Sequence, residues 1–441
     1  MSVVCIYGIA PISIEGEHIF LEEDPEAFKA FVPTDKTHAY LIERGNEEQI
    51  FKEIAWKFLF VPVSYHTTGS SRELEIFAAF EEIRTGVHLV ASDFSDFGKK
   101  VFANVVKNME CLPQSYDGTR WFGSFKNVPA IICAAGPSFA KNSAHLKTLT
   151  ERALLIGGGS ALNVLAHAGI VPHIAASIDP DPPHDRWEGQ TALEIPFFYH
   201  HRVSSHLLAQ VQGPTFWVKD AEAHPVEKWF YDDLQLKGPA LEGGWNVATF
   251  STALAAALGC NPIIFVGLDL RLEEGQLYAP GVTGERKEAP KDWEMAALWL
   301  EEFIQAHPEI QFINATEGGR GFIGALPLKL KDVPLDPQED LRSRIAQLPK
   351  VSGPDAGSSV DALKKSLQHC HDIFEEHLAF PLSTTSSIEE EIAYVHILAP
   401  LWNIWQHVFA RHVPPGTFES NLNKTLFLKN VSEQLLYEVC D

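Results

Sequence analysis

Short apolar runs, separated by loops and helical segments, dominate the chain from about residue 125 to 330. The runs are continuous rather than alternating, which is typical of strands buried on both faces of a sheet. Their alternation with helices predicts an α/β domain with a doubly wound, mostly parallel sheet. The predicted strands are 129–133, 153–157, 173–179, 195–200, 215–218, 262–269 and 311–315. The predicted helices between them are 160–168, 204–211, 246–258 and 293–306.

The N-terminal part of the chain has a pattern of its own. Strands are predicted at 38–43 and 58–65, and helices at 51–60 and 73–85. We therefore predict a small N-terminal α/β domain over residues 1–110, followed by a central domain over residues 125–330. Residues 111–126 contain Pro, Gly and Ser with few apolar repeats, which favours a domain boundary there.

Beyond about residue 355 the strand signals stop. Helical spacing returns at 359–376, 387–410 and 421–437, with Pro and Gly between these segments. The pattern predicts a helical C-terminal region over residues 355–441 that adds no strand to the sheet.

Charge and cysteine usage narrow the function classes. The 441 residues include 35 Lys and Arg against 58 Asp and Glu, a net charge of −23, which argues against duplex nucleic acid as a partner. A single nucleotide is compatible with this charge, because backbone amides at a helix start can hold its phosphate. Six scattered cysteines without a CxxC pair, and a first segment without a basic start, favour a cytoplasmic protein. The longest apolar tract, 250–268, contains Gly259 and Pro262, so no membrane span is predicted.

Six polar or glycine-rich loops follow the predicted strands. Ligands of open α/β sheets bind beyond the carboxyl ends of the strands, so these loops are candidate binding elements. In the first, Gly136 gives conformational freedom, Pro137 stiffens the loop, and Ser138 can cap the next helix or bind a ligand. An ordinary strand-to-helix turn explains this loop equally well.

The next two loops carry glycines and a carboxylate. Residues 157–159 are consecutive glycines, of which Gly158 would allow a ligand or another backbone to come close, and Ser160 is a candidate helix cap. A tight connection is the alternative. Asp179 ends the third strand, where a carboxylate can bind ribose hydroxyls or a metal. The alternative for Asp179 is a solvated turn residue.

The remaining loops complete the candidate nucleotide site. Gly243, Gly244 and Asn246 precede an apolar helix, and such a helix start attracts anions. We expect Gly244→Val to weaken ligand binding more than stability, provided that Gly244 does not require a positive φ. Asp269 ends a buried strand, and Tyr278 after it could stack on a base or sugar. Asn314 follows the last strand.

His200 and His201 follow the strand 195–200 and are candidate general bases, although a histidine in such a place more often has no catalytic role. His369 and His371 lack further ligands at metal-site spacing, and no metal site is predicted. The P-loop pattern GxxxxGK[ST] is absent, which argues against a P-loop kinase.

Five segments together resemble the central domain of the motility-associated factor glycosyltransferases, which is similar to that of archaeal 6-hydroxymethylpterin diphosphokinases. The segments are PAIICAAGPSF, LLIGGGSALNVLAHAGIVPHIAASIDP, GGWNVATFSTALAAALGCNPIIFVGLDL, YAPG and NATEGG. The N-terminal unit and the helical tail resemble the longer motility-factor architecture. The resemblance implies a Rossmann-like sheet similar to that of bacterial sialyltransferases.

The same resemblance implies roles for individual residues. Ala135 would line the nucleotide site with Gly136, Pro137 and Ser138, and the glycines before Asn246 would face the phosphate of a CMP-activated nonulosonic acid. The chain departs from the family pattern at Ala134, where glycine is common, and at Tyr278, where the family has a Thr-His-Ala stretch.

We therefore expect transfer of a sugar from a nucleotide donor, such as a CMP-sugar, to a protein hydroxyl. The expected catalytic groups are Asp179, His200 and His201, and the expected co-substrate is the nucleotide-sugar donor, with no further cofactor assigned. Two alternatives stay open. One is a 6-hydroxymethylpterin diphosphokinase that uses ATP and Mg²⁺, with Asp179 and Asp181 as metal ligands. The other is a non-catalytic protein that binds a nucleotide or sugar.

Overall fold

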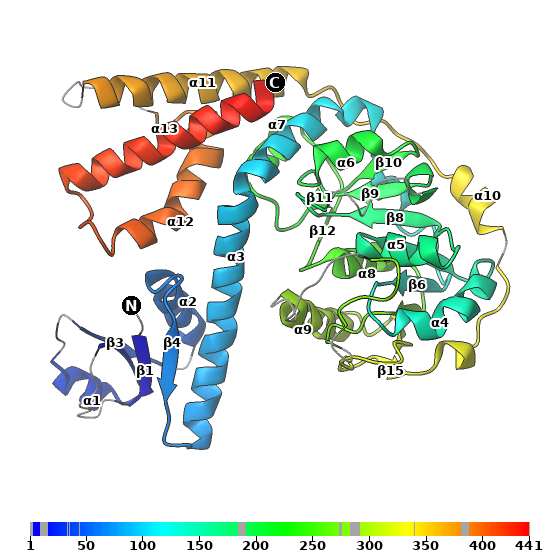
Figure 1. Ribbon diagram of the computed structural model, residues 1–441, viewed down its shortest axis with the longest axis horizontal. Helices are drawn as coiled ribbons and strands as arrows, with labels where there is room; N and C mark the ends of the chain where they lie inside the picture. Colours follow the sequence, from blue (N-terminus) through cyan, green and yellow to red (C-terminus); the bar gives the residue numbers. More distant parts are fainter. Residues whose placement is uncertain are drawn as a thin grey trace. The chain divides into compact units, whose positions relative to one another are not determined.

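The computed structural model contains two compact units of helices and parallel strands (Figure 1). One unit comprises residues up to Gly98 together with Ala399–Leu428, and the other comprises Lys99–Leu398 and the chain end from Lys429. Helices α3 (Ser71–Glu110) and α13 (Phe418–Cys440) contribute to both units. The structure describes residues 3–8, 16–32, 34, 36–43, 45–183, 191–272, 276–282, 292–338, 340–380 and 388–440.

The larger unit is built on a nine-stranded parallel sheet of order β15-β14-β13-β6-β7-β8-β9-β10-β5. Its first strands are β5 (Tyr116–Asp117), β6 (Ala130–Cys133), β7 (Leu154–Gly158), β8 (Ile174–Ser177) and β9 (Phe197–Tyr199). The others are β10 (Thr215–Trp217), β13 (Ile263–Val266), β14 (Phe312–Asn314) and β15 (Leu326–Pro327). A separate pair, β11 (Lys219–Asp220) and β12 (Ala240–Leu241), lies outside this sheet.

Helices cover both faces of the large sheet. Successive side chains of a strand point to opposite faces, and two neighbouring glycines of β7 show which helix lies on each. A Cβ atom at Gly157 would contact Leu165 of α5 (Ser160–His167), whereas a Cβ atom at Gly158 would contact Val247 of α8 (Val247–Ala257). The fold is therefore a doubly wound, Rossmann-like sheet, as the sequence predicted.

Further helices connect the strands or follow the sheet. They are α4 (Phe139–Leu146), α6 (Ser205–Gln210), α7 (Pro225–Asp233), α9 (Asp292–Ala306), α10 (Leu341–Ala346) and α11 (Gly357–Ala379). A π-helix (Tyr394–Leu398) leads into α12 (Ala399–Phe409). After residue 355 the described part of the chain contains helices and no strand, which agrees with the helical C-terminal region expected.

All seven predicted strands and all four predicted helices of the middle region are present, with ends that shift by a few residues. The structure adds the edge strands β5 and β15, each too short to produce an apolar run. Residues 111–126, which we expected to mark a boundary, contain β5 and two fully buried core residues, Trp121 and Phe125. This segment therefore packs into the larger unit, while the limits of the three domains stay predictions.

The smaller unit has a four-stranded parallel sheet of order β3-β2-β1-β4. Its core includes the buried residues Phe51 of α2 (Glu47–Lys57) and Phe80 of α3. Gly98 lies inside the 40-residue helix α3, where a Cβ atom would lie 2.9 Å from Leu401 Cδ2. The glycine therefore leaves room for Leu401 to pack against the helix. The strands are β1 (Val3–Tyr7), β2 (Glu17–Glu22), β3 (Thr37–Leu41) and β4 (Val63–His66), and α1 (Pro25–Ala30) follows β2.

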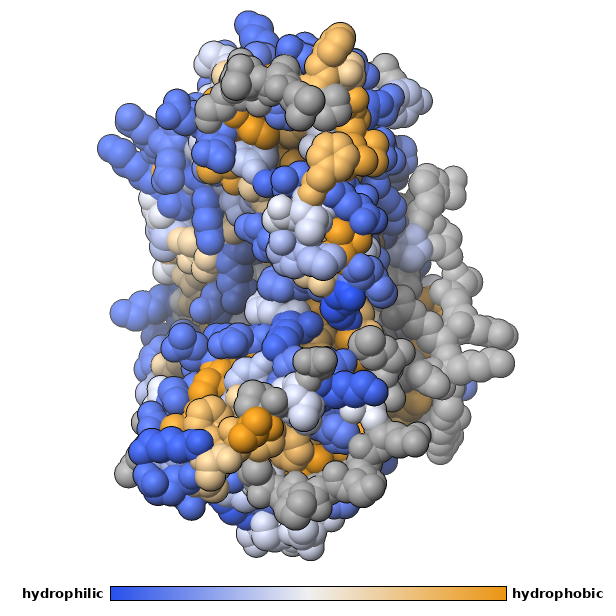
Figure 2. All heavy atoms as spheres, turned by 90° about the vertical axis from the view of Figure 1, so that its left-hand side faces the viewer, coloured by the Kyte–Doolittle hydropathy of each residue, from blue (hydrophilic) through white to orange (hydrophobic). Residues whose placement is uncertain are grey.

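The described surface is mainly polar on the face drawn in Figure 2. On this face of Figure 2, apolar residues lie in separate patches. None of the described helices combines the length and apolar character that crossing a membrane requires.

Candidate functional site

The strand order of the large sheet reverses between β6 and β13. From β6 the chain adds β7, β8, β9 and β10 on one side, whereas β13 is followed by β14 and β15 on the other. The loops after β6 and β13 therefore leave the sheet in opposite directions, and ligands of doubly wound folds bind at such a point. Both loops were expected to bind nucleotide from the sequence.

The loops after β6 and β13 are joined by a buried hydrogen-bonded junction. Asp269 Oδ2 accepts a hydrogen bond of 2.8 Å from Ser138 Oγ and one of 3.2 Å from Ser138 N–H. Both side chains are almost fully buried. Ser138 is the N-cap residue of α4, but its hydroxyl binds Asp269 instead of the helix amides. Asp269 therefore has a structural partner, which the sequence did not reveal.

The glycines of these loops allow the two backbones to approach each other. A Cβ atom at Gly136 would collide with the Asp269 carboxylate, and one at Gly267 would lie 2.6 Å from the Ala134 carbonyl oxygen. Gly136 N–H also donates to the Gly267 carbonyl at 2.8 Å. Contact between the loops thus explains both glycines without a ligand.

The glycines after β7 serve mainly to pack α8 on the sheet. A Cβ atom at Gly158 would collide with the Ala176 carbonyl and with Val247. Gly159 has φ 53 and is the N-cap residue of α5, so Ser160 is the first helical residue and not the cap. This close packing brings the start of α8 to the carboxyl end of β7.

The start of α8 is closed by its own side chains. Asn246 is the N-cap residue, as predicted, and its Oδ1 accepts from the N–H groups of Ala248 at 2.9 Å and Thr249 at 3.1 Å. Gly244 has φ 60, and a Cβ atom there would lie 2.5 Å from Thr249 Oγ1. Gly244 therefore does require a positive φ, contrary to the condition under which Gly244→Val was expected to test binding. This substitution would strain the backbone whether or not a ligand binds.

Asp179 lies in a half-exposed turn beyond β8. Its Oδ1 accepts a hydrogen bond of 3.0 Å from Asp181 N–H, and its carbonyl accepts one of 3.0 Å from Ser204 N–H. Asp181 forms an ion pair with Lys100. The turn is therefore fixed on both sides, while the Asp179 side chain keeps access to solvent.

Two further predicted residues lie on loops that meet this edge of the sheet. Tyr278 is half-exposed, and the next residue, Ala279, donates its N–H to the Ala135 carbonyl at 2.8 Å. Asn314 Oδ1 accepts from Thr316 N–H at 3.0 Å and so shapes the turn after β14.

The half-exposed predicted residues other than Asn314 are called the rim, because they share the carboxyl-end edge of the sheet and remain accessible. The rim consists of Pro137, Ser160, Asp179, Asn246 and Tyr278, together with the backbone of Gly136 and Gly244.

A second group of polar residues at the same edge is buried. His200 Nδ1 lies 3.2 Å from Asp220 Oδ2, and the His200 ring packs edge-on against Phe250 of α8. A Cβ atom at Gly243 would lie 3.3 Å from the His200 ring. Burial raises the pKa of Asp220, but the charge and hydrogen bond of His200 outweigh burial and hold this pKa below its usual value.

His201 belongs to the same buried group. Its Nδ1 lies 3.3 Å from the Tyr231 hydroxyl, which also accepts from Asp220 N–H at 3.2 Å and lies 3.5 Å from Glu227 Oε1. Burial lowers the pKa of His201 to about 4, so its imidazole is neutral near pH 7. We call His200, His201, Asp220, Glu227 and Tyr231 the histidine cluster; all five side chains are buried.

The burial of the cluster bears on the catalytic residues that the sequence suggested. His200 and His201 have no exposed surface, whereas Asp179 is half-exposed. A general base must reach the proton that it removes. The geometry therefore favours Asp179 over the two histidines, and all three roles stay predictions.

The sequence analysis did not single out Asp220, Glu227 or Tyr231. Asp220 follows the predicted strand 215–218 by two residues, and a carboxylate just beyond a strand was a signal that could have drawn attention to it. In the part of the chain that the structure describes, no three His, Cys, Asp or Glu side chains are grouped so that they could hold a metal ion.

The central region of the chain is similar to a known protein family. Residues 103–275 match the model of the family described as 6-hydroxymethylpterin diphosphokinase MptE-like. This region is similar to the MptE-like family. The match covers less than half of the chain, and it includes every rim residue except Tyr278 together with the whole histidine cluster. No curated protein matches the sequence.

Among solved structures, the chain is similar to the MAf glycosyltransferase from Magnetospirillum magneticum AMB-1. The TM-score is 0.57 at 13% sequence identity, over 96% of this chain and 74% of that chain. At this identity the likeness concerns the fold alone. It extends beyond the MptE-like region to the flanking regions.

Proposed function

We propose that the protein is a glycosyltransferase that moves a sugar, such as a nonulosonic acid, from a nucleotide donor to a protein hydroxyl, and that the nucleotide binds the rim. The observation that carries the proposal is the convergence of half-exposed residues from five separate connections at the edge where the strand order reverses. The fold likeness to a glycosyltransferase over 96% of the chain supports this reading, because it includes both flanks of the MptE-like region.

In the proposed reaction the bond between the sugar and the donor phosphate breaks, and a bond from the acceptor oxygen to the sugar forms. Asp179 takes the proton of the acceptor hydroxyl, since it is the accessible carboxylate among the predicted catalytic groups. Tyr278 contacts the base or sugar. The Asn246 side chain already binds the Ala248 and Thr249 amides, so other groups at this helix start would contact the departing phosphate.

The second candidate is a 6-hydroxymethylpterin diphosphokinase, which the description of the matching family favours. That reaction requires Mg²⁺ on ATP, and Asp179 with Asp181 would be its ligands. Asp181 is paired with Lys100, which weakens this assignment.

Calorimetric titration of the full chain with CMP, a CMP-sugar, a UDP-sugar, ATP with Mg²⁺ and hydroxymethylpterin distinguishes the candidates. We expect CMP and the CMP-sugar to bind. Binding of ATP and the pterin, without binding of CMP, would replace the proposal with the diphosphokinase. Binding of the CMP-sugar without transfer to any offered hydroxyl would favour the non-catalytic protein.

A matched pair of variants tests the location. Ser160→Phe places a ring on the rim at the first residue of α5, and we expect at least a tenfold loss of CMP affinity with an unchanged melting temperature. The control is Thr148→Phe, at an exposed position just beyond the C-terminal end of α4, and this variant should bind CMP normally. Normal CMP binding by a folded Ser160→Phe protein would exclude the rim as the binding site.

A further inference from the structure

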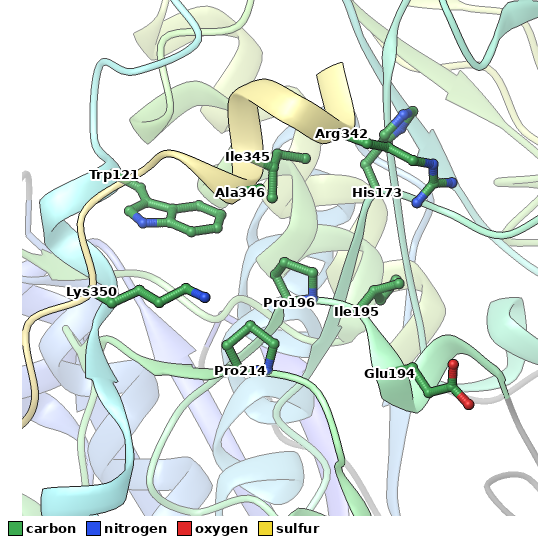
Figure 3. Close-up of a pocket in the computed structure, with 10 residues that line it drawn as sticks. All are labelled: Trp121, His173, Glu194, Ile195, Pro196, Pro214, Arg342, Ile345, Ala346 and Lys350. Atoms are coloured by element: carbon green, nitrogen blue, oxygen red, sulfur yellow. The ribbon is translucent and has the colours of Figure 1, made fainter. Parts of the chain in front are cut away.

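A cavity of about 240 Å³ opens at the opposite edge of the large sheet from the rim (Figure 3). Three of its wall residues directly precede strands: His173 before β8, Pro196 before β9 and Pro214 before β10. In a parallel sheet, residues that precede strands lie at the other edge from residues that follow them. The cavity is therefore separate from the candidate nucleotide site and does not depend on the proposed function.

The apolar walls of the cavity are held in place. The Pro196 carbonyl accepts from Ala175 N–H and the Pro214 carbonyl from Phe197 N–H, each at 2.9 Å, so both prolines are fixed to the sheet. Trp121 is fully buried, and its indole N–H donates to the Pro349 carbonyl at 2.9 Å. The apolar cavity is thus formed before any ligand binds, which lowers the entropy cost of binding.

The charges around the cavity are mainly positive, although the chain carries a net charge of −23. Figure 3 shows the Lys350 amino group pointing between Trp121 and Pro214 into the cavity, while the Glu194 carboxylate points away from it. Arg342 stands at the other end, where it donates to the Val171 carbonyl at 2.9 Å.

His173 does not add a third cation. Burial, followed by the charge of Arg342, lowers the pKa of His173 to about 4. Its Nδ1 accepts a hydrogen bond of 3.0 Å from Leu155 N–H, which also requires a neutral ring with its proton on Nε2.

We propose that this cavity binds a small organic anion, with one carboxylate on a flat apolar body the size of a single ring. The volume is below the roughly 300–1,000 Å³ of sites for drug-sized ligands, which limits the body to about one ring. The proline, isoleucine and tryptophan walls bury that body, and Lys350, which is exposed, pairs with the carboxylate on the solvent side of the cavity. A ligand without the charge would leave the Lys350 ammonium without this partner.

The test uses the full chain, with benzoate as the probe and benzamide as its neutral isostere, and ligand-observed NMR as the measurement. We expect benzoate to bind at millimolar concentration, with at least tenfold higher affinity than benzamide. Lys350→Met keeps the apolar stem and removes the charge, and it should lower benzoate affinity about fivefold or more. Lys329→Met, an exposed lysine elsewhere on the larger unit, should not.

A second variant separates loss of charge from loss of the cavity. Ala346→Trp, at the exposed last residue of α10, fills the cavity without entering the core, and it should abolish binding of both probes. The proposal is overturned if benzoate does not bind the wild-type protein. It is also overturned if a folded Ala346→Trp protein binds benzoate normally, or if benzoate and benzamide bind with equal affinity.

Discussion

The rim and the histidine cluster lie at the same edge of the same sheet, yet solvent reaches only the rim. Asp179 is half-exposed, whereas His200 and His201 have no exposed surface. Both regions consist of polar residues that follow strands, and both include a candidate base. The difference shows that a polar residue just beyond a strand can have either of two roles. It can contact a ligand, or it can hold the surrounding loops in place, and its position in the sequence does not tell which.

Substitutions in the histidine cluster should therefore lower stability most, whereas substitutions on the rim should lower ligand binding or catalysis most. A buried polar group that loses its partner is destabilising, because it then has neither water nor another group to bond with. A half-exposed side chain can be replaced at small cost in stability, so its contribution is visible in binding or catalysis.

Asp220→Ala should have the largest effect on the free energy of unfolding. It leaves His200, whose Nδ1 lies 3.2 Å from Asp220 Oδ2, buried without this partner. We expect a loss of about 2–3 kcal/mol, the upper part of the range for a buried group that loses its hydrogen-bond partner, measured by urea denaturation of the wild-type and variant proteins. Asp232→Ala, at an exposed position of α7, should cost under about 0.5 kcal/mol. Equal, small losses in both variants would mean that the cluster contributes little to stability.

The sequence could predict the strands of the large sheet because each one is a continuous apolar run between helical segments. It could not predict β5 or the burial of Trp121, because a two-residue strand leaves no periodic pattern. The lack of space for a side chain at Gly244 also depends on Thr249, five residues later, and no local rule reveals it.

The candidate site was harder to predict from the sequence than the fold. The predicted nucleotide-binding residues lie at strand ends, on loops or at helix starts, but sequence did not show that Ser138 binds Asp269 or that His201 is buried. Those facts depend on contacts between segments far apart in the chain. Whether the predicted residues bind a nucleotide stays a prediction.

A smaller effect is expected from the pH dependence of the histidine cluster. The pKa of His201 is about 4 in the folded protein and 6.5 in an ordinary environment. Between these values the unfolded chain binds a proton that the folded protein does not, so stability falls as the pH decreases from about 6.5 to about 4. At pH 5 this histidine should account for a loss of about 2 kcal/mol relative to pH 7.

The measurement is the free energy of unfolding from urea denaturation at pH 7 and pH 5. His201→Gln should remove this share of the pH dependence, whatever its effect on stability at pH 7. His206→Gln, at an exposed position of α6, should keep the wild-type dependence. A His201→Gln protein with the wild-type difference between the two pH values would show that His201 does not remain neutral in the folded protein.

The smallest effect on stability is expected for Asp179→Asn on the rim. The asparagine keeps an oxygen that can accept from Asp181 N–H, as Asp179 Oδ1 does at 3.0 Å, and the position is half-exposed. We expect a change in unfolding free energy below about 0.5 kcal/mol. The amide cannot accept the acceptor's proton, however, so sugar transfer should slow by about a hundredfold or more while CMP affinity stays within about threefold. Single-turnover transfer from a CMP-sugar measures this loss, with Asp181→Asn as the neighbouring control. Unchanged transfer by Asp179→Asn would remove this carboxylate from the reaction, and the rim would then bind the donor without supplying the base.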